Sequence, residues 1–383
     1  MVVVGAGIAG LSAAFSLLKG GLPPNRILLL EAGAIGEGDS VRHSGILNPA
    51  FSEPYGRLRS SLGKNAARLK RFSYRNLERM ISAGEQFEFD WELELPGFVQ
   101  AAGSEQEEDE LIESVPLLRA DGFSAEFLTP GDLSSRIGFK TPWGGIFDER
   151  GGGGHPVQWL HGMARGLIQR GVRVHTSSPV TQIFSRVDGT VELLIAGANS
   201  ICVRSECAIL AWNTYALDLD ANLANYVFPR SAQLLCFPPN PLNKSMPVRP
   251  LQPSVHYQFG QFRIRRIQDG RLIFSCYRHQ EESKRGSALL AKNIQEQLLK
   301  FVRSHFPELK NQTPEIQWEA RQACTVDGLP LIGPHPSIQG ALLCLGFNGS
   351  SFNLAAEAGN LCSELVLNGT ASDADLFSPR RLL

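Results

Sequence analysis

The chain has 383 residues, of which 43% are hydrophobic and 20% charged, and its formal net charge at pH 7 is -1. This is the composition of an ordinary folded protein, and the length suggests two or three structural units rather than one compact core. Because 37 Lys and Arg balance 38 Asp and Glu, the global charge provides no attraction to nucleic acid or to an anionic membrane.

No apolar run approaches the roughly 18 to 20 residues that a membrane-spanning helix needs, and the N-terminus begins with a strand pattern rather than a signal peptide. The seven cysteines are scattered and contain no Cys-x-x-Cys pair. Such usage is typical of reduced thiols rather than of a disulfide framework or a zinc site. We therefore expect a cytoplasmic protein without a metal centre; the sequence leaves open whether residues precede Met1.

A glycine fingerprint, GAGIAG at residues 5–10, directly follows a short apolar strand pattern and opens a helical pattern. Gly5 permits the tight turn, Gly7 lets a pyrophosphate approach the backbone, and Gly10 lets the helix pack closely on the strand. The phosphates would lie at the N-terminus of the helix, where unpaired N–H groups favour negative charge. The pattern predicts a dinucleotide site; a turn that serves only packing is the alternative.

The next apolar run, Ile27 to Leu30, ends in Glu31, 21 residues after Gly10. At this distance a carboxylate at the end of a strand accepts hydrogen bonds from a ribose hydroxyl. A carboxylate suits a ribose without a 2′-phosphate, so the pattern favours FAD or NAD over NADP.

Residues 57–84 combine apolar positions at helical spacing with eight lysines and arginines. We interpret this segment as a helix with a solvated basic face, with an RNA-binding surface as the alternative. Residues 86–148 are expected to form short strands and loops around a solvated acidic helix over 105–118.

The segment GGGGHP at residues 151–156 precedes a helical pattern over 157–170 and a strand over 172–175, so the chain returns to the nucleotide domain. Further strands are expected at 191–195 and 207–211. Apolar segments at 234–237, 262–264 and 272–276, with a turn at Asp269-Gly270, indicate an antiparallel sheet. A helix over 287–306 and a final strand, loop and helix complete the chain.

These elements predict an α/β fold with a Rossmann-type FAD-binding domain and a second, inserted α+β substrate domain of mainly antiparallel sheet. We expect a discontinuous FAD-binding domain from residues 1–85, 145–225 and 318–383. Residues 86–144 and 226–317 would form the substrate domain.

The C-terminal segment TVDGLPLIGP at residues 325–334 is followed by a strand over 341–345, the loop GFNG at 346–349 and a helix over 350–367. Together with the first ten residues, this unit resembles the FAD-dependent D-amino-acid oxidase superfamily, which includes glycine, sarcosine and γ-glutamylputrescine oxidases. The segments SVRHSG at 40–45 and ILAWNTY at 209–215 resemble the second cofactor loop and the central motif of that superfamily. The resemblance spans almost the whole chain.

The fingerprint and the resemblance imply FAD as the cofactor. The N-terminus of the helix over 350–367 would stabilise the negative charge of the reduced flavin. His43 and His155 are each open to a second interpretation, as core or loop histidines. The expected cofactor-binding residues are Gly5, Gly7, Ile8, Ala9, Gly10, Glu31, Ala32, Arg42, His43, Ser44, Gly45, Val180, Ala211, Gly346, Asn348, Gly349, Ser350 and Ser351.

Amino-acid-specific members of the superfamily often place an Arg five residues before the Asp of the Asp-Gly pair, where it binds the substrate carboxylate. Here Gln322 occupies that position, and Arg321 is its neighbour. Since a shift by one residue turns a strand side chain to the other face, this departure favours an amine or a differently anchored acid. Arg278 is the substitute that we consider, with a solvent-facing side chain as its alternative. The candidate catalytic-site residues are therefore Arg278, Arg321 and Gln322.

We predict an FAD-dependent enzyme that oxidises a C–N bond of a small amine or amino acid to an imine by hydride transfer to the flavin. Oxygen or another acceptor would reoxidise the flavin, and nucleic acid is not expected as a partner. Two alternatives stay open: an FAD oxidoreductase that modifies the tRNA wobble uridine, whose fold is shared, and a non-catalytic flavin-binding subunit.

Overall fold

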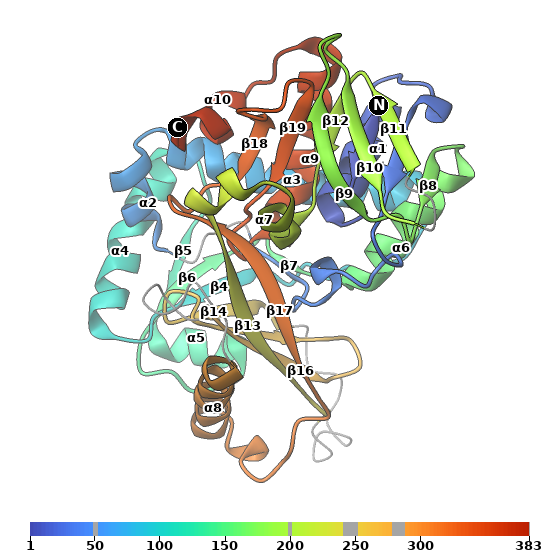
Figure 1. Ribbon diagram of the computed structural model, residues 1–383. Helices are drawn as coiled ribbons and strands as arrows, with labels where there is room; N and C mark the ends of the chain where they lie inside the picture. Colours follow the sequence, from blue (N-terminus) through green and yellow to red (C-terminus); the bar gives the residue numbers. More distant parts are fainter. Residues whose placement is uncertain (49–52, 198–200, 240–251, 278–287, 383) are drawn as a thin grey trace.

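The computed structural model describes the chain except residues 49–52, 198–200, 240–251, 278–287 and 383 (Figure 1). Two large sheets organise the molecule. A six-stranded sheet lies in the upper half of Figure 1, and an eight-stranded sheet lies in the lower half. The expected mixed fold, with a Rossmann-type part and a mainly antiparallel part, is confirmed.

The six-stranded sheet contains strands from both the N-terminal and the C-terminal parts of the chain. Its strands are parallel except for β18, which runs antiparallel to β19. In spatial order they are β18 (Leu331–Pro334), β19 (Ala341–Leu345), β12 (Ala208–Leu210), β1 (Val2–Val4), β2 (Leu28–Leu30) and β8 (Arg173–His175).

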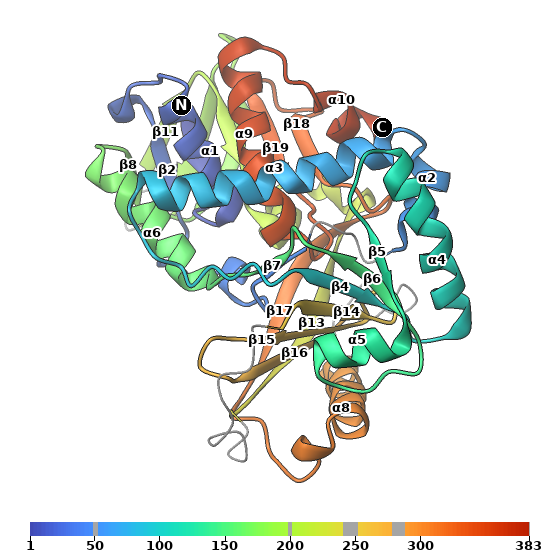
Figure 2. The ribbon, with the colours of Figure 1, turned by 180° about the vertical axis from the view of Figure 1, so that it is seen from behind.

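Layers cover both faces of this sheet. One face carries helices α1 (Ile8–Lys19), α9 (Ser351–Asn368) and α6 (Pro156–Gln169), with the long helix α3 (Asn65–Gln86) packed across α9 (Figure 2). The other face packs against a small sheet of β9 (Val180–Ser185), β10 (Val191–Ile195) and β11 (Ile201–Ser205).

Strand β1 consists of three valines and is buried on both faces. Val3 belongs to the core beneath the helices, whereas Val2 and Val4 belong to the core beneath the small sheet. A strand buried on both sides needs a continuous apolar run rather than an alternating pattern. This explains why the strand could be predicted from the sequence although it has only three residues.

The eight-stranded sheet is mainly antiparallel, with one parallel pair between β14 and β4. Its spatial order is β17 (Ile316–Thr325), β13 (Val227–Phe237), β16 (Leu272–Tyr277), β15 (Phe262–Arg266), β14 (Ser254–Tyr257), β4 (Phe98–Ala101), β6 (Gly145–Asp148) and β5 (Glu126–Leu128). The long strands β13 and β17 extend toward the six-stranded sheet (Figure 1).

Side chains alternate between two faces of the eight-stranded sheet. Phe262 and Ile264 pack in the core that includes Leu298 of helix α8 (Ala288–His305). Arg263 and Arg265 therefore point to the opposite face, and Arg265 there reaches the backbone of the cofactor loop at Ser44. We call this second face, directed toward the six-stranded sheet, the inner face.

The remaining helices and strands are short or peripheral. They are α2 (Tyr55–Leu62), β3 (Ile46–Leu47), α4 (Glu105–Ala120), α5 (Pro130–Ile137), β7 (Gly152–Gly153), α7 (Ala216–Leu219) and α10 (Ala374–Phe377).

The basic segment differs from the expectation in two ways. It forms two helices, α2 and α3, because Gly63 at their junction has a φ of 57°, a left-handed conformation that ends the first helix. Its basic face is also not simply solvated, since most of its cations are paired. The pairs include Arg57–Glu110 at 2.6 Å, Arg59–Asp121 at 3.0 Å, Arg68–Asp375 at 2.6 Å, Lys70–Asp148 at 2.8 Å and Arg75–Glu357 at 2.7 Å.

The seven cysteines are free thiols, as expected, and five of them are buried. Within the described ranges, no helix is both long enough and apolar enough to span a membrane. The same part of the chain contains no cluster of His, Cys, Asp or Glu that could bind a metal ion.

Candidate cofactor and substrate site

The fingerprint glycines occupy positions where a side chain would collide. Gly5 has a φ of 97°, and its N–H donates to the carbonyl of Leu30 over 2.8 Å. A Cβ on Gly10 would overlap the carbonyl oxygen of Gly5, and a Cβ on Gly7 would lie 2.7 Å from Oγ of Ser40. The backbone at the start of α1 is therefore accessible only because these residues are glycine.

Glu31 lies directly beside the fingerprint. Its Oε2 accepts a 2.7 Å hydrogen bond from the N–H of Ala6, and its Oε1 accepts one of 3.2 Å from the N–H of Gly33. The backbone carbonyl of Glu31 accepts from Ser178, two residues before the buried side chain of Val180. Glu31 thus lies where the fingerprint predicts the acceptor for a ribose hydroxyl.

The second cofactor loop turns back toward the fingerprint. The N–H of Ile8 donates to Oγ of Ser40 over 3.3 Å, and the His43 ring lies 4.5 Å from the ring of Phe352 in α9. Nδ1 of His43 accepts from Gly45, while its Nε2 is buried and has no hydrogen-bond partner among the described residues. Burial lowers the pKa of His43 to about 3, so the ring is neutral.

Other expected residues of this region have exposed side chains or make local contacts. Ala32 and Arg42 are exposed, and the Arg42 side chain donates to the carbonyl of Glu37. Nδ1 of His155 lies 3.5 Å from the N–H of Gln158, so His155 caps helix α6 and fits the interpretation of a loop histidine. Asp39, which the sequence reasoning did not select, accepts a 3.0 Å hydrogen bond from the N–H of Arg321.

The C-terminal loop is held in a fixed shape before α9. Gly346, Asn348 and Gly349 all have positive φ, at 79°, 53° and 78°. Oδ1 of Asn348 accepts from the N–H of Thr325 over 2.9 Å, and its Nδ2 donates to the carbonyl of Gly346 over 2.7 Å. No side chain caps the N-terminus of α9 at Ser350, which leaves its N–H groups directed outward.

A cavity of about 60 Å³ connects these parts. It joins the N-terminus of α1, the second cofactor loop and the loop before α9, and its other wall is β17. The lining residues are Gly7, Ile8, Ala9, Asp39, Ser40, Ala211, Asn213, Ala320, Arg321, Gln322, Ala323, Cys344, Phe347, Asn348, Gly349, Ser351 and Ala355. The glycine backbone, the N-termini of α1 and α9 and a ribose acceptor at Glu31 form a donor and acceptor set that fits FAD.

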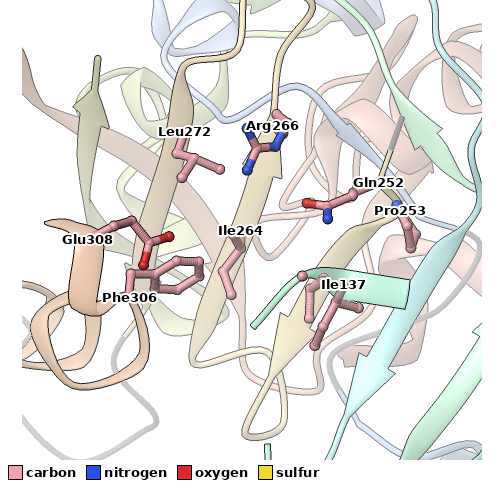
Figure 3. A pocket seen from close by; sticks show the side chains of 10 residues that line it. Ile137, Gln252, Pro253, Ile264, Arg266, Leu272, Phe306 and Glu308 are labelled. Carbon is pink, nitrogen blue, oxygen red and sulfur yellow. The ribbon is translucent and has the colours of Figure 1, made fainter. Parts of the chain in front are cut away.

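A second cavity, of about 240 Å³, lies on the other side of the eight-stranded sheet (Figure 3). Ile264, Arg266 and Leu272 line it together with Phe306 and Glu308. Because these strand residues belong to the face covered by α8, the sheet separates this cavity from the fingerprint. It is therefore not part of the cofactor site.

The two neighbouring candidates on β17 point to opposite faces. Gln322 pairs with Arg230 and Arg321 with Ser231 on β13. The Gln322 side chain extends to Gly349 in the C-terminal loop before α9, whereas Arg321 is exposed. Arg278, the third candidate, lies outside the described residues.

The sequence reasoning missed two arginines on the inner face. Nη1 of Arg265 donates to the carbonyls of Ser44, Gly45 and Gly154 at 2.7 to 3.2 Å, and Nη1 of Arg263 donates to the carbonyl of Gly349 over 2.9 Å. The alternation Phe-Arg-Ile-Arg at 262–265 contained this signal, because it predicts both arginines on one face of a strand. The residues that the two arginines contact depend on the tertiary fold, so these contacts could not be predicted from the sequence.

Known proteins resemble this chain in sequence and in fold. Residues 1–365 match the model of the family described as FAD dependent oxidoreductase, DAO. The chain is 25% identical to the probable oxidoreductase OrdL of Haemophilus influenzae, over 95% of this chain and 82% of that protein. It is 24% identical to gamma-glutamylputrescine oxidoreductase of Escherichia coli, over 98% and 85%.

Among solved structures, glycine oxidase from Geobacillus kaustophilus has the same fold. The TM-score is 0.79, with 22% identical residues over 98% of this chain and 97% of that one. The shared fold therefore extends over nearly the whole of both chains.

Proposed function

Because the chain belongs to the family of FAD-dependent oxidoreductases, we propose that it oxidises a C–N bond of a small amine or amino acid to an imine. The observation that carries the proposal is the cavity that runs from the fingerprint to β17 and ends against the inner face. One wall of this cavity fits the cofactor, and the opposite wall offers polar side chains for a substrate.

When bound, FAD would supply the acceptor for a hydride from the carbon next to the substrate nitrogen, and the imine so formed would hydrolyse in water. The residues of the chain have other tasks. The fingerprint and Glu31 hold the adenine nucleotide end, and the N-terminus of α9 supplies a favourable dipole for the negative charge of the reduced flavin, worth up to roughly 1 to 2 kcal/mol. The inner face would orient the substrate toward the flavin.

No side chain needs to act as a general base if the substrate binds as the neutral amine. His43 is compatible with this mechanism, because burial holds its pKa at about 3 and keeps the ring uncharged beside the cofactor loop. The relatives named gamma-glutamylputrescine oxidoreductase and glycine oxidase support an amine or amino acid as the substrate class. Turnover would require oxygen or another electron acceptor.

The experiment is anaerobic reduction of the purified flavoprotein by a panel of primary and secondary amines and amino acids. We expect at least one to bleach the oxidised flavin absorbance and to yield the carbonyl product of imine hydrolysis. If no member of a broad panel reduces the flavin while dithionite does, a non-catalytic flavin-binding role replaces the proposal.

The ion pairs along α2 and α3 argue against the tRNA alternative. Arg75 and Arg79 both pair with Glu357, so they are not available as a row of phosphate contacts. Salt-sensitive binding of tRNA would restore that alternative, because several phosphate contacts release counterions.

A further inference from the structure

Four polar side chains form one row across the inner face. Register pairs place Gln100 on β4 beside His256 on β14, His256 beside Arg263 on β15, and Arg263 beside Ser275 on β16. Directly opposed residues on neighbouring strands point to the same face and have Cβ atoms about 4.5 to 5.5 Å apart. We call these four residues the polar row.

The polar row is buried, and part of it lacks partners. Exposed fractions are 6% for Gln100, 1% for His256, 6% for Arg263 and 0% for Ser275. Neither ring nitrogen of His256 nor Oγ of Ser275 has a hydrogen-bond partner within the described part of the chain. These two side chains lie on β14 and β16, on either side of Arg263 in β15. Since a buried polar group without a partner costs about 1 to 3 kcal/mol, two such groups flanking one arginine indicate a polar ligand.

Arg263 joins the polar row to the cofactor site. Its Nη1 donates to the carbonyl of Gly349 over 2.9 Å, and its guanidinium lies 3.9 Å above the ring of Tyr277. The Gln322 side chain also reaches Gly349, and both Gln322 and Gly349 line the cofactor cavity. The guanidinium of Arg263 is therefore bonded to the loop that lines that cavity, next to Gln322.

The charges around the row favour an anion with a single negative charge. His256 is neutral because burial, followed by the neighbouring Arg263, holds its pKa well below the usual range. Its ring and the Ser275 hydroxyl can still donate hydrogen bonds, and a guanidinium matches the two oxygens of a carboxylate.

We propose that the polar row is the subsite for a carboxylate of the substrate, with Arg263 as the charged donor and His256 and Ser275 as neutral donors. This inference rests on the proposed function and narrows its substrate class to amines that carry an acid. In this proposal the substrate carboxylate is bound by side chains of β14 to β16 rather than by β17, which has Gln322 at the expected position.

The test measures binding of simple probes to the FAD-loaded protein by ligand-observed NMR titration, without turnover. Acetate carries the carboxylate, and acetamide is its neutral counterpart. We expect the wild type to bind acetate more tightly, and Arg263→Gln to weaken acetate binding by roughly ten- to hundredfold while acetamide binding changes little. Arg266→Gln is the matched control, because it removes an arginine from the same strand on the face shown in Figure 3.

Equal binding of acetate by the wild type and Arg263→Gln would overturn the proposal, and so would a wild type that prefers acetamide. If Arg263→Gln does not retain FAD, Arg263→Lys and Ser275→Ala decide instead. Both should bind acetate several-fold more weakly, and unchanged affinity in both contradicts the subsite. Because the probes report binding alone, a protein that binds acetate through Arg263 yet is reduced by no amine would refute the proposed function and retain the subsite.

Discussion

The cofactor region and the inner face differ in how the chain encodes them. Around the fingerprint, contacts come from backbone atoms and from glycines that are close together in the sequence. The polar row instead assembles side chains from four strands, between Gln100 and Ser275. A site built from backbone leaves a local signature, whereas a site built from side chains appears only when strand register is known.

The largest effect on cofactor binding should come from a substitution in the glycine fingerprint. Gly7→Val places a branched side chain against Ser40 and in the space that the pyrophosphate needs, so we expect loss of bound FAD with most secondary structure retained. Denaturing extraction and circular dichroism measure the two quantities. Gly131→Ala is the control, since a Cβ there meets no atom within 4 Å. A Gly7→Val protein with a full complement of FAD would show that the cofactor binds elsewhere.

The next largest effect tests the arginine that links the two regions. Arg265→Met removes the guanidinium that donates to the carbonyls of Ser44, Gly45 and Gly154. The Gly45 carbonyl keeps the N–H of Gly154, so the carbonyls of Ser44 and Gly154 lose this buried donor. At about 1 to 3 kcal/mol for each buried unsatisfied group, partly relieved by water, we expect the free energy of unfolding to fall by roughly 3 kcal/mol. Denaturant titration of the FAD-loaded protein measures this value. A loss below about 0.5 kcal/mol would mean that Arg265 does not hold the cofactor loop.

A smaller effect is expected at the ribose acceptor. Glu31→Gln removes the charge but keeps the shape, and loss of one charge-assisted hydrogen bond of about 1.5 kcal/mol corresponds to roughly tenfold weaker FAD binding. Fluorescence titration of the apoprotein with FAD gives the dissociation constant. Unchanged affinity would leave Glu31 with a structural role alone, as the acceptor for the N–H groups of Ala6 and Gly33.

The smallest effect should follow a change on the far face of β17. Arg321→Gln is expected to alter the ratio of kcat/KM for an acidic substrate over a neutral amine by less than about threefold, because the Arg321 side chain is exposed and points away from Gln322. Gln322→Arg is the informative partner variant, as it adds a cation next to Gly349 and should raise the preference for the acid. A large effect of Arg321→Gln would place the acid-binding group on β17.

The same contrast explains what the sequence could predict. The fingerprint, Glu31 and the loop at 346–349 were found because the spacing of glycines and strands follows from local geometry. The pairing of Arg75 with Glu357 was not found, since 282 residues separate the two. His256 and Ser275 carried no signal at all, because each reads as an ordinary polar residue in a strand until the register brings them together.

The most direct test of the account combines both regions in one measurement. It follows anaerobic reduction of bound FAD by an N-alkyl glycine and by the matched amine in which a methyl group replaces the carboxylate, in the wild type and in Arg263→Gln. The account predicts that the wild type is reduced at least tenfold faster by the acid at subsaturating concentration, and that this preference disappears in the variant while FAD content is unchanged. A wild type that prefers the amine, or a preference that survives in Arg263→Gln, would contradict it.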